Sequence, residues 1–346
     1  MKKGVVLFNL GGPDKLENVE PFLFNLFNDP AILNLPFFFR YPLAKLISKR
    51  RTPIAKKIYE ELGGSSPILS LTIEQSDSLE KSLNENQEND EYKCFVVMRC
   101  WHPREKDVVH AAIKYNPDEI ILLPLYPQYS AATSGSSIKE WENICSKENY
   151  KVKTRKICCY PTDKNFIEAH AIEIKKKINN LNNFKLIFSA HGLPEKNIKK
   201  GDPYQWQIEQ SVKALVEVLK VEKIELDWIL SYQSRVGPLK WIGPSTDDVI
   251  IKNSKIGKNL VIVPIAFVSE HSETLVELDI EYKKLAQNNG CKNYIRVPAL
   301  GVNENFITSL SNLITNMNLS NVDKNIFSPK NKCPSNFIKC PCRFNV

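Results

Sequence analysis

The sequence predicts an α/β fold made of two halves, each a parallel sheet covered by helices on both faces. Short runs rich in Val, Ile and Leu alternate with segments of helical periodicity along the chain. These runs are almost continuously apolar, which is typical of parallel strands that are buried on both faces. The chain has 346 residues, enough to build two separate hydrophobic cores.

The expected strands share this apolar character and are bounded by polar, Gly or Pro residues; they lie at 4–10, 92–98, 119–125, 151–158, 185–190, 227–232, 260–264 and 294–297. The expected helices lie between them, at 19–27, 53–62, 73–84, 107–115, 136–145, 165–180, 207–219, 273–287 and 303–318. This alternation is typical of βαβ units, so each half is expected to be Rossmann-like. We expect domains at 1–162 and 163–320, followed by a tail at 321–346.

Ligands of such folds bind beyond the carboxyl ends of the strands. The segments at those positions carry Gly, His, aromatic and hydroxyl side chains; they are 10–13, 125–130, 189–194, 231–235 and 270–281. We therefore expect these segments to line one cleft between the halves.

An acidic stripe marks the last of these segments. Glu273, Glu277 and Glu281 follow His271 at intervals of four residues, and on an α-helix they would drift by only about 80°. Like charges at this spacing destabilise a helix, so a cation or migrating protons are expected beside them. The alternative is a solvated helix face on which Asp279 pairs with Lys283.

His191 ends an expected strand and is flanked by small residues that leave its ring accessible. A lone His is often structural, but this one shares the expected cleft with a second His and the acidic stripe. No Gly-x-Gly-x-x-Gly fingerprint, Walker loop or Gly-x-Ser-x-Gly elbow is present, which argues against the corresponding nucleotide-binding and hydrolase classes.

The net charge of +8 is spread along the chain, apart from the basic segment 45–51, so we expect no nucleic-acid partner. No run of eighteen apolar residues predicts a membrane span. The N-terminal apolar run is too short for a signal peptide and reads as a strand. We therefore expect a cytoplasmic protein that starts at residue 1.

Several of these motifs, in this order, resemble those of the ferrochelatases, which insert Fe²⁺ into a porphyrin. They include Leu-Phe-Asn-Leu-Gly-Gly-Pro at 7–13, Gly-Gly-Ser-Ser-Pro-Ile at 63–68, Met-Arg-Cys-Trp-His-Pro at 98–103, Leu-Pro-Leu-Tyr-Pro-Gln-Tyr-Ser at 123–130, Ser-Ala-His-Gly-Leu-Pro at 189–194, Ser-Tyr-Gln-Ser-Arg-Val-Gly-Pro at 231–238 and the helix 271–282. The ordered set covers nearly the whole chain and is much more specific than any single motif.

The resemblance implies two chelatase-type domains around a porphyrin cleft, and a lyase that makes protohaem from Fe²⁺ and protoporphyrin IX with release of two protons. It implies His191 and Glu273 as the catalytic and metal-site pair, with Glu277, Glu281 and His271 as a relay. Further porphyrin contacts are implied at Leu10, Arg99, Tyr126 and Ser130. Many relatives have Tyr where this chain has Cys100, so no contact is expected from that side chain.

The residue types suit this reaction. A His with a pKa near 6.5 can accept a pyrrole proton or ligate iron at neutral pH. A carboxylate is a hard oxygen ligand that releases Fe²⁺ more readily than thiolates do. Both roles of His191 remain open at this point, as does whether iron or protons follow the stripe.

Three other functions compete with this one. Coproporphyrin III ferrochelatase and cobalt chelatase are enzymes of the same fold; a tetrapyrrole or metal carrier would bind without turnover. Coproporphyrin carries more carboxylates and needs more cationic contacts, whereas the apolar segment described next favours protoporphyrin IX.

The segment from about 30 to 42 contains three consecutive Phe residues, Phe37–Phe39. Three adjacent side chains cannot all face one core, so some should be exposed. By resemblance this segment is a lip over the porphyrin, and with Lys45, Lys49, Arg50 and Arg51 nearby it predicts peripheral association with the inner membrane. The alternative is a helical hairpin packed on the first domain.

The nine cysteines include three near the chain end, Cys333, Cys340 and Cys342. Their C-x₆-C-x-C spacing resembles that of bacterial ferrochelatases that bind a [2Fe–2S] cluster with a further mid-chain Cys. Cys158 is the candidate for that fourth ligand, with its neighbour Cys159 as the alternative. Ala131 stands where animal-type relatives have their mid-chain Cys, which excludes that arrangement.

Overall fold

The computed structural model describes residues 1–85, 90–178, 183–221, 227–235, 237–319, 326–327 and 333–343. The chain forms two compact units, and the second begins at Cys159. The division is not linear, because Leu313–Phe327 belong to the first unit while Ser328–Val346 belong to the second. The end of the helix expected at 165–180 and half of the tail expected at 321–346 lie outside the described residues.

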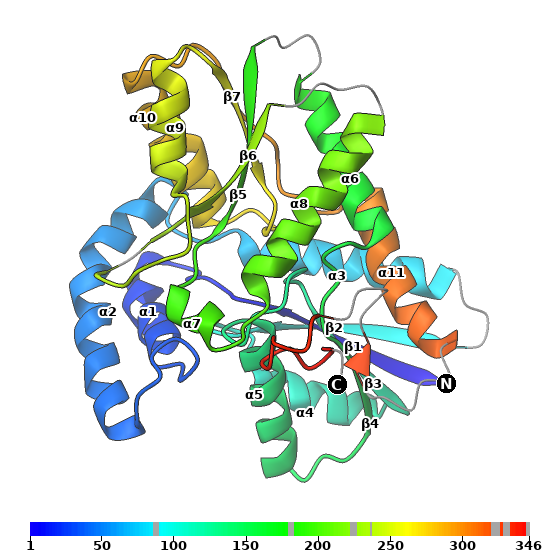
Figure 1. The fold of residues 1–346 in the computed structure, drawn as a ribbon. Coiled ribbons are helices and arrows are strands. Elements are labelled where there is room, and N and C mark those ends of the chain that lie inside the picture. Colours follow the sequence, from blue (N-terminus) through cyan, green and yellow to red (C-terminus); the bar gives the residue numbers. More distant parts are fainter. Residues whose placement is uncertain are drawn as a thin grey trace. The chain divides into compact units, whose positions relative to one another are not determined.

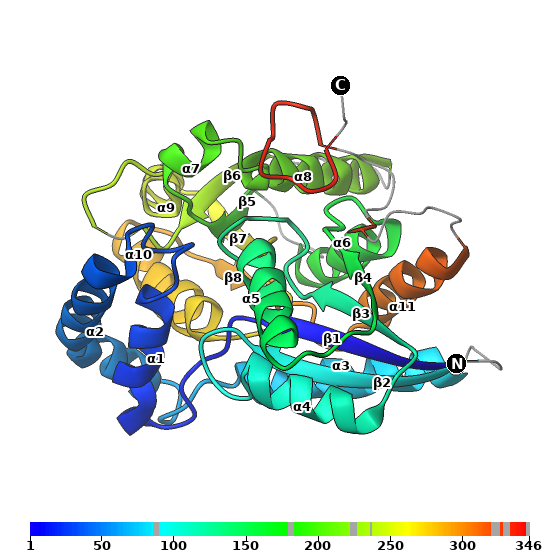
Figure 2. The same ribbon diagram turned by 90° about the horizontal axis from the view of Figure 1, so that it is seen from below.

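The first unit is built on a parallel sheet in the order β2-β1-β3-β4-β9. Its strands are β1 (Lys2–Asn9), β2 (Glu91–Met98), β3 (Glu119–Pro124), β4 (Lys153–Ile157) and β9 (Ile326–Phe327). Its helices are η1 (Leu16–Asn18), α1 (Val19–Phe27), α2 (Phe37–Glu60), α3 (Ile68–Glu85), α4 (Glu105–Tyr115) and α5 (Ser134–Lys147). Figure 2 shows α4 and α5 lying side by side along this sheet.

The core of the first unit follows from the apolar strands. Val6 and Phe8 of β1 are fully buried together with Trp141 of α5, whose ring meets that of Phe8 edge-on at 6.1 Å. β1 lies between β2 and β3, and its residues 3–9 are all buried, as the continuous apolar run predicted.

The second unit is built on a parallel sheet in the order β6-β5-β7-β8. Its strands are β5 (Phe184–His191), β6 (Trp228–Gln233), β7 (Asn259–Pro264) and β8 (Tyr294–Arg296). Its helices are α6 (Lys164–Ile178), α7 (Glu195–Lys199), α8 (Tyr204–Val221), α9 (Thr246–Lys255), η2 (Glu273–Tyr282) and α10 (Lys283–Asn288); α11 (Glu304–Leu319) begins here and ends in the first unit. Figure 1 shows α6 and α8 on one face of this sheet and α9 and α10 on the other.

The prediction of parallel sheets flanked by helices is confirmed, and each expected strand is present within a few residues. The expected helix at 53–62 was too short. α2 begins at Phe37 and carries Pro42 and Pro53 in its interior, where proline normally ends a helix. The short elements α7, α9 and β9 were not predicted, although Ser245 signals the start of α9 by accepting a hydrogen bond from the Asp248 amide.

The acidic segment is a π-helix rather than an α-helix. η2 spans Glu273–Tyr282 and continues into α10. In a π-helix the backbone bonds run between residues five apart, and such segments are frequent at functional sites. The expected spacing of about 100° per residue was therefore wrong for this segment.

Candidate active site

Neighbouring strands of the second unit carry the predicted metal-site pair. β5 ends at His191, which lies opposite Gln233, the last residue of β6. The chain that leaves β7 on the other side of β5 leads to His271 and then to Glu273, the first residue of η2. Because parallel strands end at the same edge of a sheet, these side chains meet there.

The His191 ring has a defined tautomer. Its Nδ1 lies 2.6 Å from the carbonyl oxygen of Gly192. Since a carbonyl only accepts, Nδ1 carries the hydrogen and Nε2 of the neutral ring keeps a lone pair. Nε2 lies 3.6 Å from Oε1 of Glu273, and the His191 side chain is 40% exposed.

His271 approaches the other oxygen of Glu273 in the same way. Its Nδ1 lies 3.0 Å from the carbonyl oxygen of Ser269, and its Nε2 lies 3.8 Å from Oε2 of Glu273. Burial would lower the pKa of His271, but the neighbouring Glu273 carboxylate outweighs that effect and raises it. The ring packs against Phe267 with a centroid separation of 4.8 Å.

Glu273 therefore lies between two imidazoles at distances longer than a hydrogen bond. Burial would raise the pKa of Glu273, but the charges of His191 and His271 outweigh it and lower the pKa to about 2. Its Oε2 is buried without a hydrogen-bond partner in the part of the chain that the structure describes. When both rings are neutral, the carboxylate faces one nitrogen lone pair of each imidazole, and a proton or a metal ion can bind between them.

Glu277 lies in a different environment, one turn further along η2. It accepts hydrogen bonds from the Ser234 amide at 2.9 Å, the Ser234 hydroxyl at 2.5 Å and Gln233 Nε2 at 3.0 Å. Burial and the charge of Glu273 raise the pKa of Glu277, although the bonds from Ser234 and Gln233 oppose this. Two nearby carboxyl groups with pKa values shifted in opposite directions are typical of acid–base sites.

Glu281 differs from the other two members of the stripe. It is exposed, and the structure records no hydrogen bond or ion pair for it among the described residues. The alternative pairing of Asp279 with Lys283 is wrong. Asp279 instead accepts two hydrogen bonds from Arg296, at 2.7 and 2.6 Å.

Several residues of the site were missed by sequence reasoning. Arg296 also donates to Glu270 at 2.6 Å, so one guanidinium fixes both the residue before His271 and the middle of η2. Gln233 joins the backbone oxygen of Glu273 to the Glu277 side chain. Trp241 lies with its ring centroid 6.5 Å from that of His191. No local sequence pattern identifies Arg296 or Trp241 as a site residue. Gln233 lies in the motif at 231–238, but that motif gave it no role.

The residues with implied porphyrin contacts belong to the first unit. Leu10 follows β1 and is partly buried against α1 and α2. Arg99 is committed to internal partners, with Nη2 2.8 Å from Asp29, Nη1 3.6 Å from Glu105 and Nε 3.0 Å from the Ser136 hydroxyl. Ser130 is buried and accepts from the Ala132 amide, and burial raises the pKa of Tyr126.

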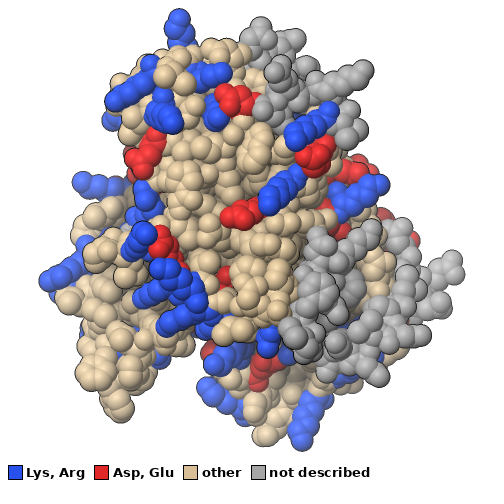
Figure 3. Space-filling view, in the orientation of Figure 1, with Lys and Arg blue, Asp and Glu red and all other residues tan. Residues whose placement is uncertain are grey.

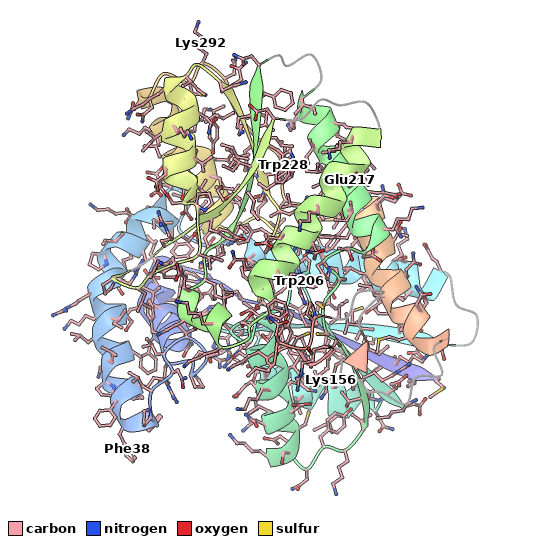
Figure 4. All side chains as sticks on the ribbon, viewed as in Figure 1. Phe38, Lys156, Trp206, Glu217, Trp228 and Lys292 are labelled. Carbon is pink, nitrogen blue, oxygen red and sulfur yellow. The ribbon has the colours of Figure 1, made fainter. Side chains whose placement is uncertain are left out.

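Cysteines of the tail lie beside α8 in the second unit. The side-chain amide of Gln207 donates to Sγ of Cys159 at 3.3 Å and to Sγ of Cys333 at 3.1 Å. The neighbouring Cys340 thiol and burial raise the pKa of Cys333. Cys342 is half-buried, and Trp206 (labelled in Figure 4) packs against Phe337 of the same segment. No three His, Cys, Asp or Glu side chains among the described residues are placed to hold a metal ion.

Comparison with solved structures defines the class of fold. The chain is similar to SirB from Bacillus subtilis with Fe³⁺, with a TM-score of 0.52 and 13% identity over 91% of this chain and 95% of that one. It is also similar to the sirohydrochlorin chelatase SirB from Bacillus subtilis subspecies spizizenii in complex with cobalt (TM-score 0.51, 11% identity, 90% and 93% coverage). At these identities the likeness shows the fold alone, which is that of a chelatase.

Sequence comparison narrows the class. The family model Ferrochelatase matches residues 2–318. The chain is 72% identical to Ferrochelatase of Pelagibacter ubique (strain HTCC1062) and 48% identical to Ferrochelatase of Rickettsia felis (strain ATCC VR-1525 / URRWXCal2), covering 99% of each. The chain belongs to the ferrochelatase family, which confirms the resemblance and the prediction of an enzyme.

Proposed function

We propose that this chain inserts Fe²⁺ into protoporphyrin IX, with release of two protons, at the site formed by His191 and Glu273. The observation that carries this proposal is the opposed pair itself. Glu273 has a lowered pKa and one buried, unpartnered oxygen among the described residues, and its Oε1 faces Nε2 of His191 across 3.6 Å. Family membership supports the reaction, and this geometry supports the two residues.

The pair suits both parts of the reaction. Nε2 of His191 can take a pyrrole proton, and the resulting imidazolium is stabilised by Glu273. Glu273 can also offer an oxygen to the incoming Fe²⁺. Imidazole and carboxylate ligands release Fe²⁺ more readily than thiolates do, so the iron substrate can pass on to the porphyrin nitrogens.

His271 and Glu277 form the proposed relay on either side of Glu273. When the His271 ring is protonated, its positive charge lies 3.8 Å from Oε2 of Glu273 and stabilises the ionised carboxylate. Glu277 is the member of the stripe whose pKa is raised by burial and by the charge of Glu273, which favours its protonated form over that of Glu273. The contacts implied for Leu10, Arg99, Tyr126 and Ser130 stay predictions, and the ion pairs of Arg99 favour a supporting role for it.

An anaerobic assay tests the function. Fe²⁺ is mixed with protoporphyrin IX or coproporphyrin III, and metalloporphyrin formation is followed by absorption. We expect turnover with protoporphyrin IX and weaker turnover with coproporphyrin III. Preference for coproporphyrin III or for Co²⁺ would instead support the sister activities, and stoichiometric binding without turnover would support a carrier.

The N-terminal end of α2 supports peripheral membrane binding. Phe37, Phe38 and Phe39 are 55%, 85% and 69% exposed, which confirms that the Phe run does not enter the core. Figure 4 shows Phe38 at the tip of α2, pointing away from the protein, and Figure 3 shows a mostly tan surface at this end of the helix, where the Arg40 guanidinium lies 5.9 Å from the centroid of the Phe37 ring. α2 also packs on α1 through Tyr41 and Phe24, so the hairpin and the exposed lip coexist.

No helix of the described residues is long and apolar enough to cross a membrane. We propose that the Phe tip instead inserts into the headgroup region while Lys45, Lys49 and Arg50 meet anionic lipids. Burying one Phe is worth about 1.5–3 kcal/mol, so the tip can drive binding.

Replacing Phe37–Phe39 by Ser is expected to weaken co-sedimentation with phosphatidylglycerol vesicles at least about tenfold, given the apolar area lost. Binding to neutral phosphatidylcholine vesicles should be weak for both proteins. Ile256→Ser, which changes a side chain 66% exposed in the other unit, is the control. Equal recovery of the triple variant and the parent would refute the lip.

We propose that the cysteines beside α8 bind a [2Fe–2S] cluster, which would supply a structural or redox-sensing group; their thiols are not arranged as a metal site in the described structure. We propose Cys333, Cys340 and Cys342 as ligands, as their spacing predicted. The shared Gln207 contact supports Cys159, rather than Cys158, as the fourth ligand. Gln207 could then donate to a ligating sulfur, as hydrogen bonds often do at such clusters.

Anaerobic purification is expected to give protein with visible iron–sulfur absorption and acid-labile sulfide. Cys159→Ser and Cys333→Ser should lose both signals, whereas Cys158→Ser and Cys145→Ser should keep them. Parent protein without labile sulfide would rule out the cluster, and loss of the signals in Cys158→Ser alone would return the fourth ligand to Cys158.

A further inference from the structure

The acidic stripe has an outlet to solvent that is separate from Glu281. The hydroxyl oxygen of Tyr282 lies 3.1 Å from Oε1 of Glu277 and 3.2 Å from Oδ2 of Asp247, so its single hydrogen can be donated to either carboxylate. Asp247 lies in the first turn of α9 and is exposed, whereas Tyr282 is buried. A single buried hydroxyl thus joins the buried carboxylate to one at the surface.

The π-helix makes this contact possible. On an α-helix, residues five apart point about 140° away from each other. In η2 the backbone bonds join residues five apart, so Tyr282 comes back to the side of Glu277. The aromatic ring is also fixed, because it packs in a core with Leu278 of η2, Val249 and Ile250 of α9, and Ile262 of β7.

We propose that Tyr282 and Asp247 form the exit through which a proton held by Glu277 leaves the site for solvent. The inference rests on the proposed function, since the metallation of a porphyrin supplies the protons that must leave. It concerns only the outward part of the path, from Glu277 to the surface.

A proton can pass from Glu277 to Asp247 while Tyr282 stays neutral, because Tyr282 gives up one hydrogen as it receives another. When Glu277 carries a proton, its O–H donates to the Tyr282 oxygen, and the Tyr282 hydrogen points to Asp247. As the proton of Glu277 moves to Tyr282, the hydrogen of Tyr282 moves to Asp247, which releases it to water. Glu277 returns to a carboxylate, and rotation of the hydroxyl restores the starting bonds. Burial and the charges of Glu277 and Asp247 raise the pKa of Tyr282, so it stays a neutral bridge.

Glu281 does not offer an equivalent route. Its side chain is exposed and has no recorded hydrogen bond to Glu277 or to another described residue. In contrast, the path through Tyr282 has both oxygens within hydrogen-bond distance of the Tyr282 hydroxyl in the structure. Two routes to solvent therefore start at Glu277, one toward Glu281 and one through Tyr282 to Asp247 of α9. Only the second is connected by hydrogen-bond distances among the described residues.

Single-turnover metallation by Tyr282→Phe and Asp247→Asn tests the exit, because product release does not limit such a measurement. We expect the rate to fall about tenfold in each, less than the roughly 10²–10⁴-fold typical of a group that transfers the proton directly. Binding of porphyrin should not change. The double variant should be no slower than either single variant, since both residues lie on one path.

Matched controls separate proton transfer from structure. Tyr294→Phe removes another buried hydroxyl that bonds η2, through the Leu278 carbonyl, but touches no carboxylate. Asp248→Asn removes a neighbouring charge from the same turn of α9. Both controls should keep the parent rate and its solvent isotope effect. Asp247→Ala should regain activity as the concentration of a small buffer such as imidazole increases.

Parent rates in folded Tyr282→Phe and Asp247→Asn, or an equal loss in Tyr294→Phe, would overturn the exit. So would the absence of buffer rescue in Asp247→Ala. These outcomes differ from a failure of the proposed function, in which the parent protein itself would not metallate protoporphyrin IX.

Discussion

His191→Ala is expected to lower the rate of protoporphyrin metallation by roughly 10²–10⁴-fold, the range for loss of a positioned acid–base group. The variant loses the nitrogen lone pair that faces Glu273, while the Gly192 carbonyl that oriented the ring remains at the surface of the site. The side chain is 40% exposed, so its removal leaves no large cavity in the core.

Anaerobic kinetics with Fe²⁺ and protoporphyrin IX, together with thermal unfolding, check this prediction. His110→Ala is the matched control, because it changes a half-exposed His that pairs only with Glu148 on the surface of the first unit. The control should keep the parent rate. Near-parental turnover in a folded His191→Ala variant would remove His191 from the catalytic site.

Glu273→Gln is expected to abolish most metallation while leaving the fold intact. The amide has nearly the same volume but carries no charge, so it cannot stabilise an imidazolium at His191 or offer a charged oxygen to Fe²⁺. Glu273→Ala should be similarly inactive. Oε2 of Glu273 is buried and has no hydrogen-bond partner in the described structure. Loss of the carboxylate should therefore lower activity more than it lowers the stability of the fold.

Comparison of variants along the stripe sharpens this test. Glu281→Gln should have a milder effect, since Glu281 is exposed and unconnected in the described residues. Glu217→Ala, on the exposed side of α8 (labelled in Figure 4), should have none. If Glu273→Gln turned over like the parent while binding porphyrin normally, the metal-site assignment would be wrong.

Much of the fold was predictable because buried parallel strands need continuous apolar runs, which the sequence shows directly. α2 was cut short because Pro42 and Pro53 end most helices, whereas here packing of α1 against α2 holds the helix through both. The winding of η2 could not be predicted from periodicity, because its carboxylates at intervals of four suit both an α-helix and a wider one.

A site residue could be predicted where a reactive side chain directly follows an apolar strand, as His191 does. It was not predictable where a contact depends on long-range packing. Arg296 lies seventeen residues beyond Asp279, yet it fixes η2. Arg99 was expected to face the porphyrin because of its motif, but nothing in the local sequence shows that Asp29 and Glu105 already occupy its guanidinium.

The π-helix makes the length of the segment 273–282 as important as its residue types. Deleting one residue would turn everything beyond it around the helix axis and break its present register. Tyr282 would then lose its contact with Glu277 and its place in the core beside α9. Ala286 of α10 would also lose its packing in that core. A substitution in η2 leaves this register in place, whereas an insertion or a deletion should destroy it.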